Sequence, residues 1–246
     1  MTARSPVRVV ISQSMLFPWV WMLEQVRLAD AYVHYDDVQF SKGSFVNRVQ
    51  IKAPEGMKWM TVPLPKLKLG QRIDEVEVPP TAQWREQHLA LLRRSLADAP
   101  FFRDAMGLVE HVYSVDYAHI SQLARASLMS LVDYFRLGET TRFVDVGDLG
   151  IPGASSERVL DVVQALGGSE YVTGHGALRY LDHARFEKAS IRVRYMDYQR
   201  LPYAQLHGPF VPYVSALDLV ANCGREGARY ITSETTDWKE LANESA

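Results

Sequence analysis

The sequence is almost without cysteine: Cys223 is the single cysteine among 246 residues. An internal disulfide and a cysteine-rich metal site are therefore excluded, and this use of cysteine is typical of a reducing compartment. Cys223 follows an apolar helical pattern at residues 216–220. We expect it to be a buried, unreactive thiol rather than a nucleophile, because free cysteines mostly behave as small apolar side chains.

The sequence also lacks an excess of positive charge and a long apolar run. Its 27 Lys and Arg nearly balance 29 Asp and Glu, which gives a formal net charge of -2. Proteins that bind phosphate backbones normally carry a basic excess, so nucleic acid is not an expected partner. No run of about 18 apolar residues occurs, and the short run at residues 7–11 is interrupted by Arg8, unlike a signal peptide. We expect a cytoplasmic protein without a membrane segment.

Several common catalytic motifs are missing as well. The sequence contains no HExxH, CxxC, GxSxG or P-loop motif, so it gives no local support for a zincin, a zinc ribbon, an α/β-hydrolase or a P-loop enzyme. The segment Gly174-His175-Gly176 is not the dinucleotide fingerprint, because Arg179 stands where the third glycine is expected. We therefore assign no cofactor and no metal ligands.

The sequence does contain a regular alternation of strand and helix patterns. Short β-branched or apolar runs predict strands, and 3.6-residue periodicity predicts the helices between them. The expected strands are residues 7–12, 31–35, 142–146, 171–173 and 191–198, and the expected helices are 20–29, one capped by Ser155 and stopped by Gly167-Gly168, and 180–189. Successive β-α-β units predict an α/β fold with a Rossmann-like, doubly wound, mostly parallel sheet.

The middle of the sequence interrupts this alternation. Residues 45–52 and 58–64 alternate apolar and polar side chains around a Pro-Glu-Gly turn at 54–56, which predicts a β-hairpin. Three helical patterns follow the hairpin. We expect a single α/β domain over residues 1–246, with a β-hairpin and loop region at 45–80 and a helical subdomain at 81–140.

The fold class predicts where a site should lie. In open parallel sheets, ligands bind beyond the carboxyl ends of the strands. That rule selects the loops at residues 13–19, 36–48, 148–156 and 174–177. The expected catalytic residues are Asp36, Asp37 and His175.

Asp36 and Asp37 could act as a general base, orient an amine or bind a metal, although ordinary turn chemistry explains such a pair equally well. Adjacent side chains after a strand point to opposite sides, so at most one of the two faces a given ligand. His175 stands between two glycines and could transfer a proton near neutral pH.

A further set of polar side chains is expected to bind substrate. Lys42 and Arg48 carry positive charge that suits a phosphate or carboxylate, while a solvated hairpin face is the alternative interpretation. The expected substrate-binding residues are Gln13, Tyr35, Gln39, Lys42, Asn47, Arg48, Gly174, Tyr180, Tyr203, Gln205 and His207.

These segments together resemble the WbqC-like family over nearly the full length of the chain. The similar stretches are residues 10–13, 17–19, 35–40, 47–48, 58–59, 61–64, 155–158, 171–174, 180–181, 203, 205 and 217–219. Ser14 departs from the family pattern, in which many members have proline. The resemblance implies an enzyme of bacterial O-antigen or other surface-polysaccharide synthesis, with a glycyltransferase role proposed for some members. It supplies no established catalytic residues.

Three functions remain open from the sequence. The leading hypothesis is an acyltransferase of the aminoacyl or glycyl type, which passes an activated acyl group to the amine of an amino sugar or another small molecule. A charged tRNA as acyl donor is the one nucleic acid partner that this hypothesis admits. The alternatives are nucleotidyl or phosphate-ester chemistry, with Asp36 and Asp37 holding Mg²⁺, and a non-catalytic assembly protein with an aromatic surface at Phe17, Trp19, Trp21 and Phe40. The sequence does not predict the oligomeric state.

Overall fold

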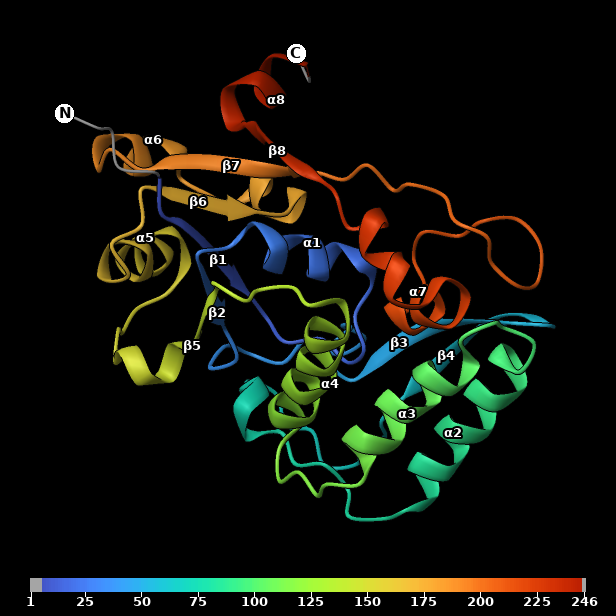
Figure 1. Ribbon diagram of the computed structural model, residues 1–246. Coiled ribbons are helices and arrows are strands. Elements are labelled where there is room, and N and C mark those ends of the chain that lie inside the picture. Colours follow the sequence, from blue (N-terminus) through green and yellow to red (C-terminus); the bar gives the residue numbers. More distant parts are fainter. Residues whose placement is uncertain (1–5, 245–246) are drawn as a thin grey trace.

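Short apolar segments of the sequence pair into a central six-stranded sheet within residues 6–244, the part of the chain that this computed structural model describes (Figure 1). The strand order is β5-β2-β1-β6-β7-β8, and β8 alone is antiparallel to its neighbour. The strands are β1 (Arg8–Ser12), β2 (Ala31–His34), β5 (Arg142–Asp145), β6 (Glu170–Thr173), β7 (Arg192–Asp197) and β8 (Glu234–Asp237). This arrangement confirms the predicted Rossmann-like, mostly parallel sheet.

Strand β1 lies at the centre of the sheet, between β2 and β6. Val10 is opposite Tyr32 of β2 on one side and Val172 of β6 on the other. From β1 the chain builds outward through β2 to β5, and it then crosses back to form β6 and β7 on the opposite side. The carboxyl ends of β1 and β6 therefore form a topological switch point, where the flanking connections diverge and leave room for a ligand.

Helices cover both faces of the sheet because alternate strand residues point to opposite sides. Val10 and Tyr32 face one layer, which contains α1, α4 and α7, whereas Val9 and Val33 face the other, which contains α5, α6 and α8. The helices are α1 (Val20–Leu28), α2 (Gln83–Leu96), α3 (Phe102–Tyr113), α4 (Ile120–Phe135), α5 (Ser155–Ala165), α6 (His183–Lys188), α7 (Ala216–Cys223) and α8 (Trp238–Glu244). Short 3-10 helices lie at Ile73–Glu75, Val146–Leu149, His175–Arg179 and Gly224–Tyr230. No helix of residues 6–244 combines the length and apolar character needed to cross a lipid bilayer.

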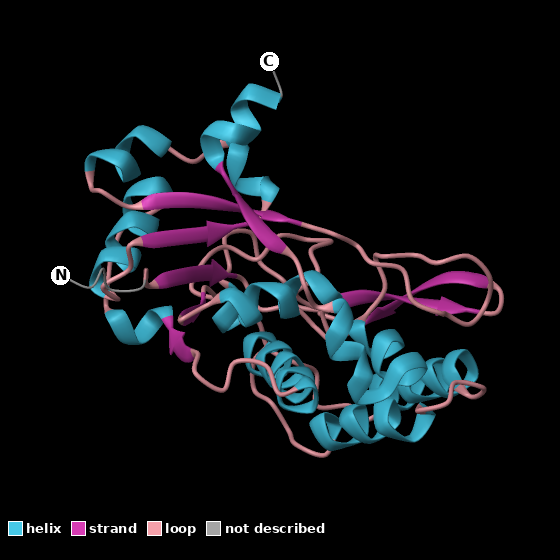
Figure 2. Cartoon of the chain, turned by 45° about the horizontal axis from the view of Figure 1, so that its top comes forward, coloured by secondary structure: helices cyan, strands magenta, loops and turns pink. Residues whose placement is uncertain are grey.

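The predicted hairpin forms, and it lies apart from the central sheet, beside the helices that follow it (Figure 2). Its strands are β3 (Arg48–Ala53) and β4 (Gly56–Thr61), so β3 begins three residues later than the expected start at residue 45. The delay follows from a turn at residues 42–46. Asn47 then closes the base of the hairpin, because its buried side-chain amide donates to the carbonyl oxygen of Val62 at 2.8 Å. His88 of α2 joins the hairpin to the helices, since its two ring nitrogens contact the carbonyl oxygen of Thr61 and the hydroxyl of Tyr113.

Two helix boundaries differ from the sequence predictions. Ser155 does not cap α5: it is the first helical residue, with a φ of 58°, and the N-cap position belongs to Ala154. The expected helix at residues 180–189 is shorter, because the Asp182 side chain accepts a hydrogen bond from the Arg185 N–H and starts α6 only at His183. The predicted stop of α5 at Gly167 and Gly168 is confirmed, with both N–H groups bonded to carbonyls of its last turn.

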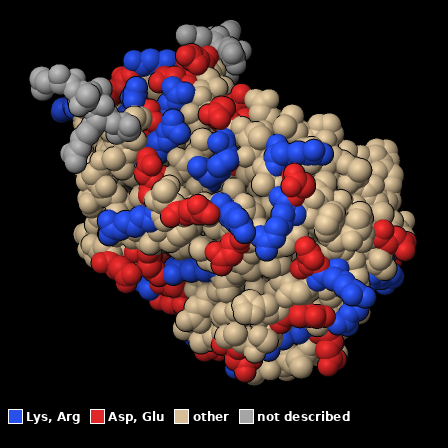
Figure 3. Space-filling view, viewed as in Figure 1, with Lys and Arg blue, Asp and Glu red and all other residues tan. Residues whose placement is uncertain are grey.

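Charged side chains of both signs are interspersed on the face of the molecule shown in Figure 3. This mixing agrees with the near balance of acidic and basic residues in the sequence. On that face, blue and red alternate over the sheet region and no broad field of one sign develops. Such a surface steers ligands by local geometry rather than by a long-range field.

Replacing Gly168 with Ala should destabilise the protein. A Cβ there would lie 2.6 Å from a Val9 methyl carbon and 2.7 Å from a Val163 methyl carbon, so the α5–β1 packing would have to shift. We expect the free energy of unfolding to fall by about 1–3 kcal/mol. The control is Gly107→Ala in α3, where a Cβ meets nothing within 4 Å and stability should hold or rise by about 0.5–1 kcal/mol. Equal effects of the two changes in urea unfolding would contradict this packing.

Candidate functional site

Asp36 anchors the carboxyl edge of the sheet. Its side chain is fully buried just after β2. The carboxylate accepts hydrogen bonds from the Ser14 N–H at 2.8 Å, from the Ser14 hydroxyl at 2.7 Å and from Arg125 Nε at 2.6 Å. Arg125 comes from α4 and also pairs with Asp145 at the end of β5. Asp36 thus joins the first loop, α4 and β5, and its burial favours a structural role over contact with a ligand.

His34 belongs to the same buried cluster. Its Nδ1 lies 3.3 Å from the Ser14 hydroxyl, and its ring stacks on Phe143 with 6.1 Å between ring centroids. Burial and, to a smaller extent, the neighbouring Arg125 charge lower the pKa of His34 to about 4, against the opposing charges of Asp36 and Asp145. The ring is therefore neutral at physiological pH and packs as part of the sheet edge.

Asp37 points to the opposite side of the sheet, as the alternation after a strand predicts. Arg158 of α5 binds it with two parallel hydrogen bonds, one of them 2.8 Å between Nη1 and Oδ1. The Arg158 guanidinium also donates to the Ile151 carbonyl oxygen and lies 5.0 Å from the centre of the Tyr35 ring. This pair lines a shallow depression of about 360 Å³, together with Arg72 and residues 146–147 and 150–153.

The two carboxylates therefore do not converge on one ligand. Asp36 pairs with Arg125 on the α4 side and Asp37 pairs with Arg158 on the α5 side. Within residues 6–244, no three His, Cys, Asp or Glu side chains are grouped so that they could hold a metal ion. The expected catalytic role of the two aspartates stays a prediction.

An aromatic cleft opens at the switch point, on the α1 side of the sheet. Its volume is about 210 Å³, and its lining is mostly apolar with a few polar groups, which is the composition typical of small-molecule sites. The lining residues are Ser12, Met15, Trp19, Trp21, Met22, Gln25, Phe45 and Tyr198. They come from the ends of β1 and β7, from α1 and from the segment that precedes the hairpin, so the fold and not a local motif assembles the cleft.

Ring packing fixes the walls of the aromatic cleft. Trp21 stacks on Tyr198 with 4.2 Å between ring centroids, and Trp19 meets Phe45 edge to face at 4.3 Å. Gln25 donates to the Tyr198 hydroxyl at 3.3 Å. Burial raises the pKa of Tyr198 to about 12, so its hydroxyl stays protonated and can donate. The Trp19 indole N–H is buried without a hydrogen-bond partner among the described residues.

Gly174 and His175 lie at the rim of the aromatic cleft. A Cβ on Gly174 would come within 2.9 Å of the Tyr198 hydroxyl, so a side chain at this position would require the Tyr198 ring to shift. His175 is exposed, and its ring centroid lies 5.6 Å from that of Tyr198. The structure thus brings two of the predicted site residues next to the cleft, with a titratable imidazole open to solvent.

Other predicted binding residues lie around the hairpin or at the surface. Arg48 donates to the Gly43 carbonyl oxygen and stacks over Trp59 at 4.1 Å. Asn47 holds the base of the hairpin, as described above. Those without a described side-chain hydrogen bond are Gln13, which is half-buried, and Gln39, Lys42 and Tyr180, which are exposed.

Tyr203 and Gln205 belong to a buried network away from the rim. The Tyr203 hydroxyl donates to Asp218 at 3.0 Å, and the Gln205 amide donates to that hydroxyl at 3.1 Å. Lys52 of β3 donates to Gln205 and to the carbonyl oxygens of Gly208 and Pro209. These bonds fix the loop between β7 and α7. A ring nitrogen of His207 lies 2.7 Å from the carbonyl oxygen of Ser95. This hydrogen bond supplies a partner for a backbone carbonyl in the last turn of α2.

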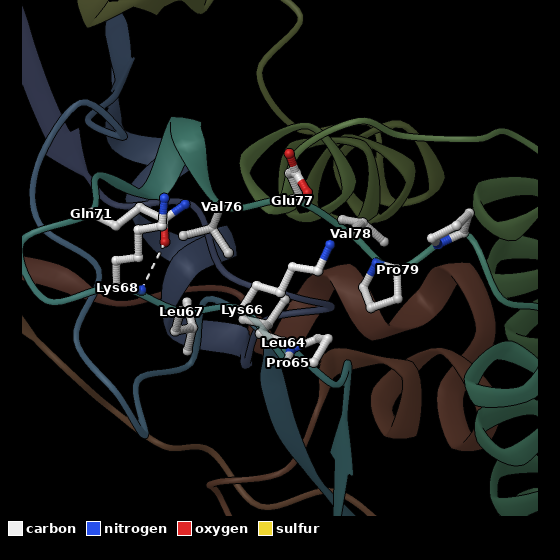
Figure 4. A pocket seen from close by; sticks show the side chains of 11 residues that line it. Leu64, Pro65, Lys66, Leu67, Lys68, Gln71, Val76, Glu77, Val78 and Pro79 are labelled. Carbon is white, nitrogen blue, oxygen red and sulfur yellow. Dashed lines mark hydrogen bonds between the residues drawn. The ribbon is translucent and has the colours of Figure 1, made fainter.

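A separate hollow of about 310 Å³ lies in the loop region after the hairpin (Figure 4). Only residues 64–68, 71 and 76–80 line it, including Lys66, Lys68 and Glu77. The Lys68 N–H donates to the Gln71 side chain at 3.1 Å across one end. No strand of the central sheet contributes a residue, so this hollow lacks the convergence of strand ends that defines the aromatic cleft.

Comparison with known sequences identifies the family. The sequence model of the WbqC-like protein family matches residues 13–230. The chain belongs to the WbqC-like family. It is also similar to uncharacterized protein Rv1507c of Mycobacterium tuberculosis, with 33% identity over 227 residues that cover 91% of this chain and 97% of the relative. No solved structure matches. The region shared with the WbqC-like family contains every residue that lines the aromatic cleft except Ser12.

Sequence reasoning missed most of the cleft in this WbqC-like protein. Trp21 and Gln25 sit on a helix, whereas the strand-end rule selected only loops. Tyr198 directly follows β7, so the same rule applied to the fifth parallel strand would have found it. Arg125, which pairs with Asp36, carries no signal that distinguishes it from a solvated helix residue. Arg158 lies in a stretch that resembles the family, but nothing in that stretch predicts its pairing with Asp37.

Replacing Asp36 with Asn should mainly destabilise the fold. The change removes the charge that pairs with Arg125 and leaves a half-buried guanidinium with a weaker partner beside a fully buried amide. We expect the free energy of unfolding to drop by about 3 kcal/mol. Asp148→Asn is a matched control at an exposed position of the same sheet edge and should change stability by at most about 0.5 kcal/mol. A wild-type unfolding midpoint for Asp36→Asn would show that the buried pair is not structural.

His34 should make stability depend on pH. The folded protein holds the pKa of His34 at about 4, against 6.5 for the free side chain. As the pH falls from 6.5 towards 4, the unfolded chain binds a proton that the folded protein does not, and stability decreases by roughly 3 kcal/mol. His34→Gln should flatten this slope in urea unfolding between pH 7 and 4. An unchanged slope would show that His34 titrates normally in the fold.

Proposed function

We propose that this WbqC-like protein is an enzyme that binds a small molecule in the aromatic cleft and transfers an activated acyl group to an amine. The observation that supports the proposal best is the position of the cleft at the switch point of a parallel sheet, where enzymes of this architecture bind their ligands. The acyl-transfer chemistry itself comes from the family resemblance. An amino sugar, or another small primary amine, is the proposed acceptor.

The cleft suits an activated acyl donor that carries a planar or apolar portion. The rings of Trp19, Phe45 and Tyr198 offer apolar surface, while Ser12 and Gln25 supply the few polar contacts that fix orientation. The unpartnered N–H of Trp19 is a further donor for a ligand atom. Such a site binds through shape and ring contact more than through charge.

The side chains at the rim can support the transfer step. The amine nitrogen forms a bond to the acyl carbon, the bond from that carbon to the leaving group breaks, and the leaving group departs with the electron pair. The amine must lose a proton, which exposed His175 can accept. Negative charge that develops on the acyl oxygen can be stabilised by the Tyr198 hydroxyl, whose own proton is not committed to Gln25.

Geometry gives less support to the two alternative functions. A Mg²⁺ site that uses both aspartates would require Asp36 and Asp37 to face the same space, whereas each is paired with an arginine on a different side of the sheet. A docking surface made of aromatic residues would require exposure. Phe17 and Phe40 are buried, and Trp19 and Trp21 line the cleft instead.

A transfer assay with matched aromatic variants tests the proposal. Glycyl-tRNA and a synthetic activated glycyl ester serve as donors and glucosamine as acceptor, with the amide product detected by mass spectrometry. Phe45→Ala removes a cleft wall and should lower kcat/KM at least tenfold, about 1.4 kcal/mol of transition-state binding. Phe101→Ala is the same change at a side chain that is 41% exposed and outside the cleft, and it should stay within about twofold of wild type.

Two outcomes would contradict the proposal. If no donor and acceptor pair gives an amide with the wild-type protein, acyl transfer of this type is wrong. If an amide forms but Phe45→Ala and Phe101→Ala turn over equally well, the reaction takes place outside the aromatic cleft. Thermal unfolding of both variants provides the control for folding.

A further inference from the structure

Arg200 is an exposed cation beside the aromatic cleft, in the loop that follows β7. It takes part in none of the ion pairs described for residues 6–244. Its guanidinium carbon lies 5.2 Å from the centre of the Trp21 ring and 5.5 Å from that of Tyr213. Trp21 is a wall of the aromatic cleft, and Tyr213 packs edge to face against both Trp21 and Trp19. Ring contacts therefore hold this arginine at the cleft and leave its charge without a carboxylate partner.

The backbone of Arg200 is in the left-handed conformation, with a φ of 49°. Glycine adopts this conformation readily, whereas a residue with a Cβ does so at a cost in free energy. The chain thus keeps an arginine at a position where glycine would be less strained. Arg136, at the end of α4, is also exposed and has a φ of 53°. Because it does not line the cleft, Arg136 is a matched control for the charge of Arg200.

The aromatic cleft has no acidic residue in its lining that could balance Arg200. Burial raises the pKa of Tyr198, a residue of the cleft wall, and the Arg200 charge opposes this shift, so that charge acts on the cleft. Glu24 lines a small cavity together with Arg200, but it accepts a hydrogen bond from Ser233, and the cation that acts on its pKa is Arg27. The charge of Arg200 is therefore available to an anionic group of a ligand.

The dimensions and polar groups of the aromatic cleft suit one planar ring system. Its volume of about 210 Å³ is below the range of about 300–1,000 Å³ that is typical of sites enclosing a whole drug-sized ligand. Gln25 donates to Tyr198 through Nε2, and its Oε1 accepts no hydrogen bond from the described residues. This oxygen can accept from an amino group at the edge of a ring. Adenine carries such an amino group, whereas uracil carries only carbonyl oxygens outside its ring.

The remainder of a ligand whose ring fills the cleft must extend past the cleft walls, towards Arg200. A guanidinium binds phosphate through two parallel N–H donors, and its contact with aromatic rings orients it in advance. Arg48 adds a second positive charge on the hairpin side, where it stacks over Trp59 at 4.1 Å. The Trp59 ring lies 5.9 Å from that of Phe45, another cleft wall. The cleft thus binds through ring contact, and the charges next to it favour an anion.

We propose that the aromatic cleft and Arg200 together bind an adenosine phosphate, with the adenine in the cleft and the phosphate on the guanidinium. This inference rests on the proposed function, because it identifies the chemistry of the activated acyl donor. An acyl adenylate and the terminal adenosine of an aminoacyl-tRNA share this chemistry. Arg200 sets the preference for the phosphate, and Gln25 sets the preference for adenine over uracil.

A binding titration of the full chain tests the site without any turnover. The probes are adenosine monophosphate, adenosine and uridine monophosphate, and ligand-observed NMR measures their affinities. We expect adenosine monophosphate to bind at least tenfold more tightly than either of the other two. Arg200→Gln removes the guanidinium and should reduce the preference for adenosine monophosphate over adenosine at least fivefold. Arg136→Gln is the same change away from the cleft and should leave this preference intact.

A second variant keeps the test decisive if Arg200→Gln folds poorly. Arg200→Gly removes the cation and places glycine at a φ of 49°, so its thermal unfolding midpoint should be no lower than that of Arg200→Gln. It should lose the same preference for the phosphate. Wild-type protein that binds adenosine and adenosine monophosphate equally, or neither, overturns the inference. So does uridine monophosphate that binds as tightly as adenosine monophosphate, or a folded Arg200→Gly that keeps the full preference.

A fourth probe distinguishes the two sources of the adenosine phosphate. Cytidylyl-adenosine carries the phosphate as a diester, as at the end of a tRNA, whereas adenosine monophosphate resembles a free adenylate. Tighter binding of the dinucleotide assigns the site to the tRNA end, and tighter binding of the mononucleotide assigns it to an adenylate. In the transfer assay, either ligand should compete with glycyl-tRNA and not with glucosamine.

The outcomes also separate this inference from the proposed function. Phe45→Ala removes ring contact, so it should weaken adenosine and adenosine monophosphate alike and leave their ratio unchanged. If the two bind wild-type protein equally but the cleft variants still reduce transfer, only the identity of the donor is wrong. If adenosine monophosphate binds through Arg200 but no amide forms, the nucleotide site stands and acyl transfer does not.

Discussion

The pairing of Asp36 with Ser14 and Arg125 holds together the edge of the sheet where ligands bind in this architecture. Ser14 belongs to the loop after β1 and Arg125 to α4, so one buried carboxylate joins a loop, a helix and the end of β2. Arg125 extends the link to β5 through Asp145. Because the loop after β1 leads directly into α1, the position of Trp19 and Trp21 beside the switch point depends on this charge pair.

The ion pairs at this edge of the sheet also limit which side chains are free to contact a ligand. The two aspartates that dominate the sequence pattern are matched by arginines on opposite sides of the sheet, and His34 is kept neutral by burial. The open titratable group near the aromatic cleft is His175. The site thus combines apolar walls with an imidazole at its rim, and the strong charges of the neighbourhood serve the scaffold.

The fold was predictable from the sequence because hydrophobic periodicity and strand-helix alternation are local signals. The strand-end rule also selected Gly174 and His175, which lie near Tyr198 at the rim of the aromatic cleft, although their role in binding or catalysis stays a prediction. It could not reveal that Asp36 is buried, since burial depends on Arg125, which is distant in the chain. Trp21 and Gln25 were equally hidden, because a helix pattern does not say which of its half-buried residues will face a strand end. The burial of Asp36 and the orientation of Trp21 and Gln25 depend on contacts with residues that are distant in the chain, which residue type alone does not reveal.

The hairpin and the loop between β7 and α7 are joined by the Lys52 amine and by the Ser215 N–H, which donates to the Gln50 carbonyl oxygen at 3.0 Å. Lys52 of β3 reaches Gln205 and two carbonyl oxygens of that loop, and the segment just before β3 carries Phe45, a wall of the aromatic cleft. The same loop carries Arg200 and Phe210, which line a cavity of about 20 Å³ that Trp21 also lines. A displacement of the hairpin would consequently move a wall of the aromatic cleft and this loop together.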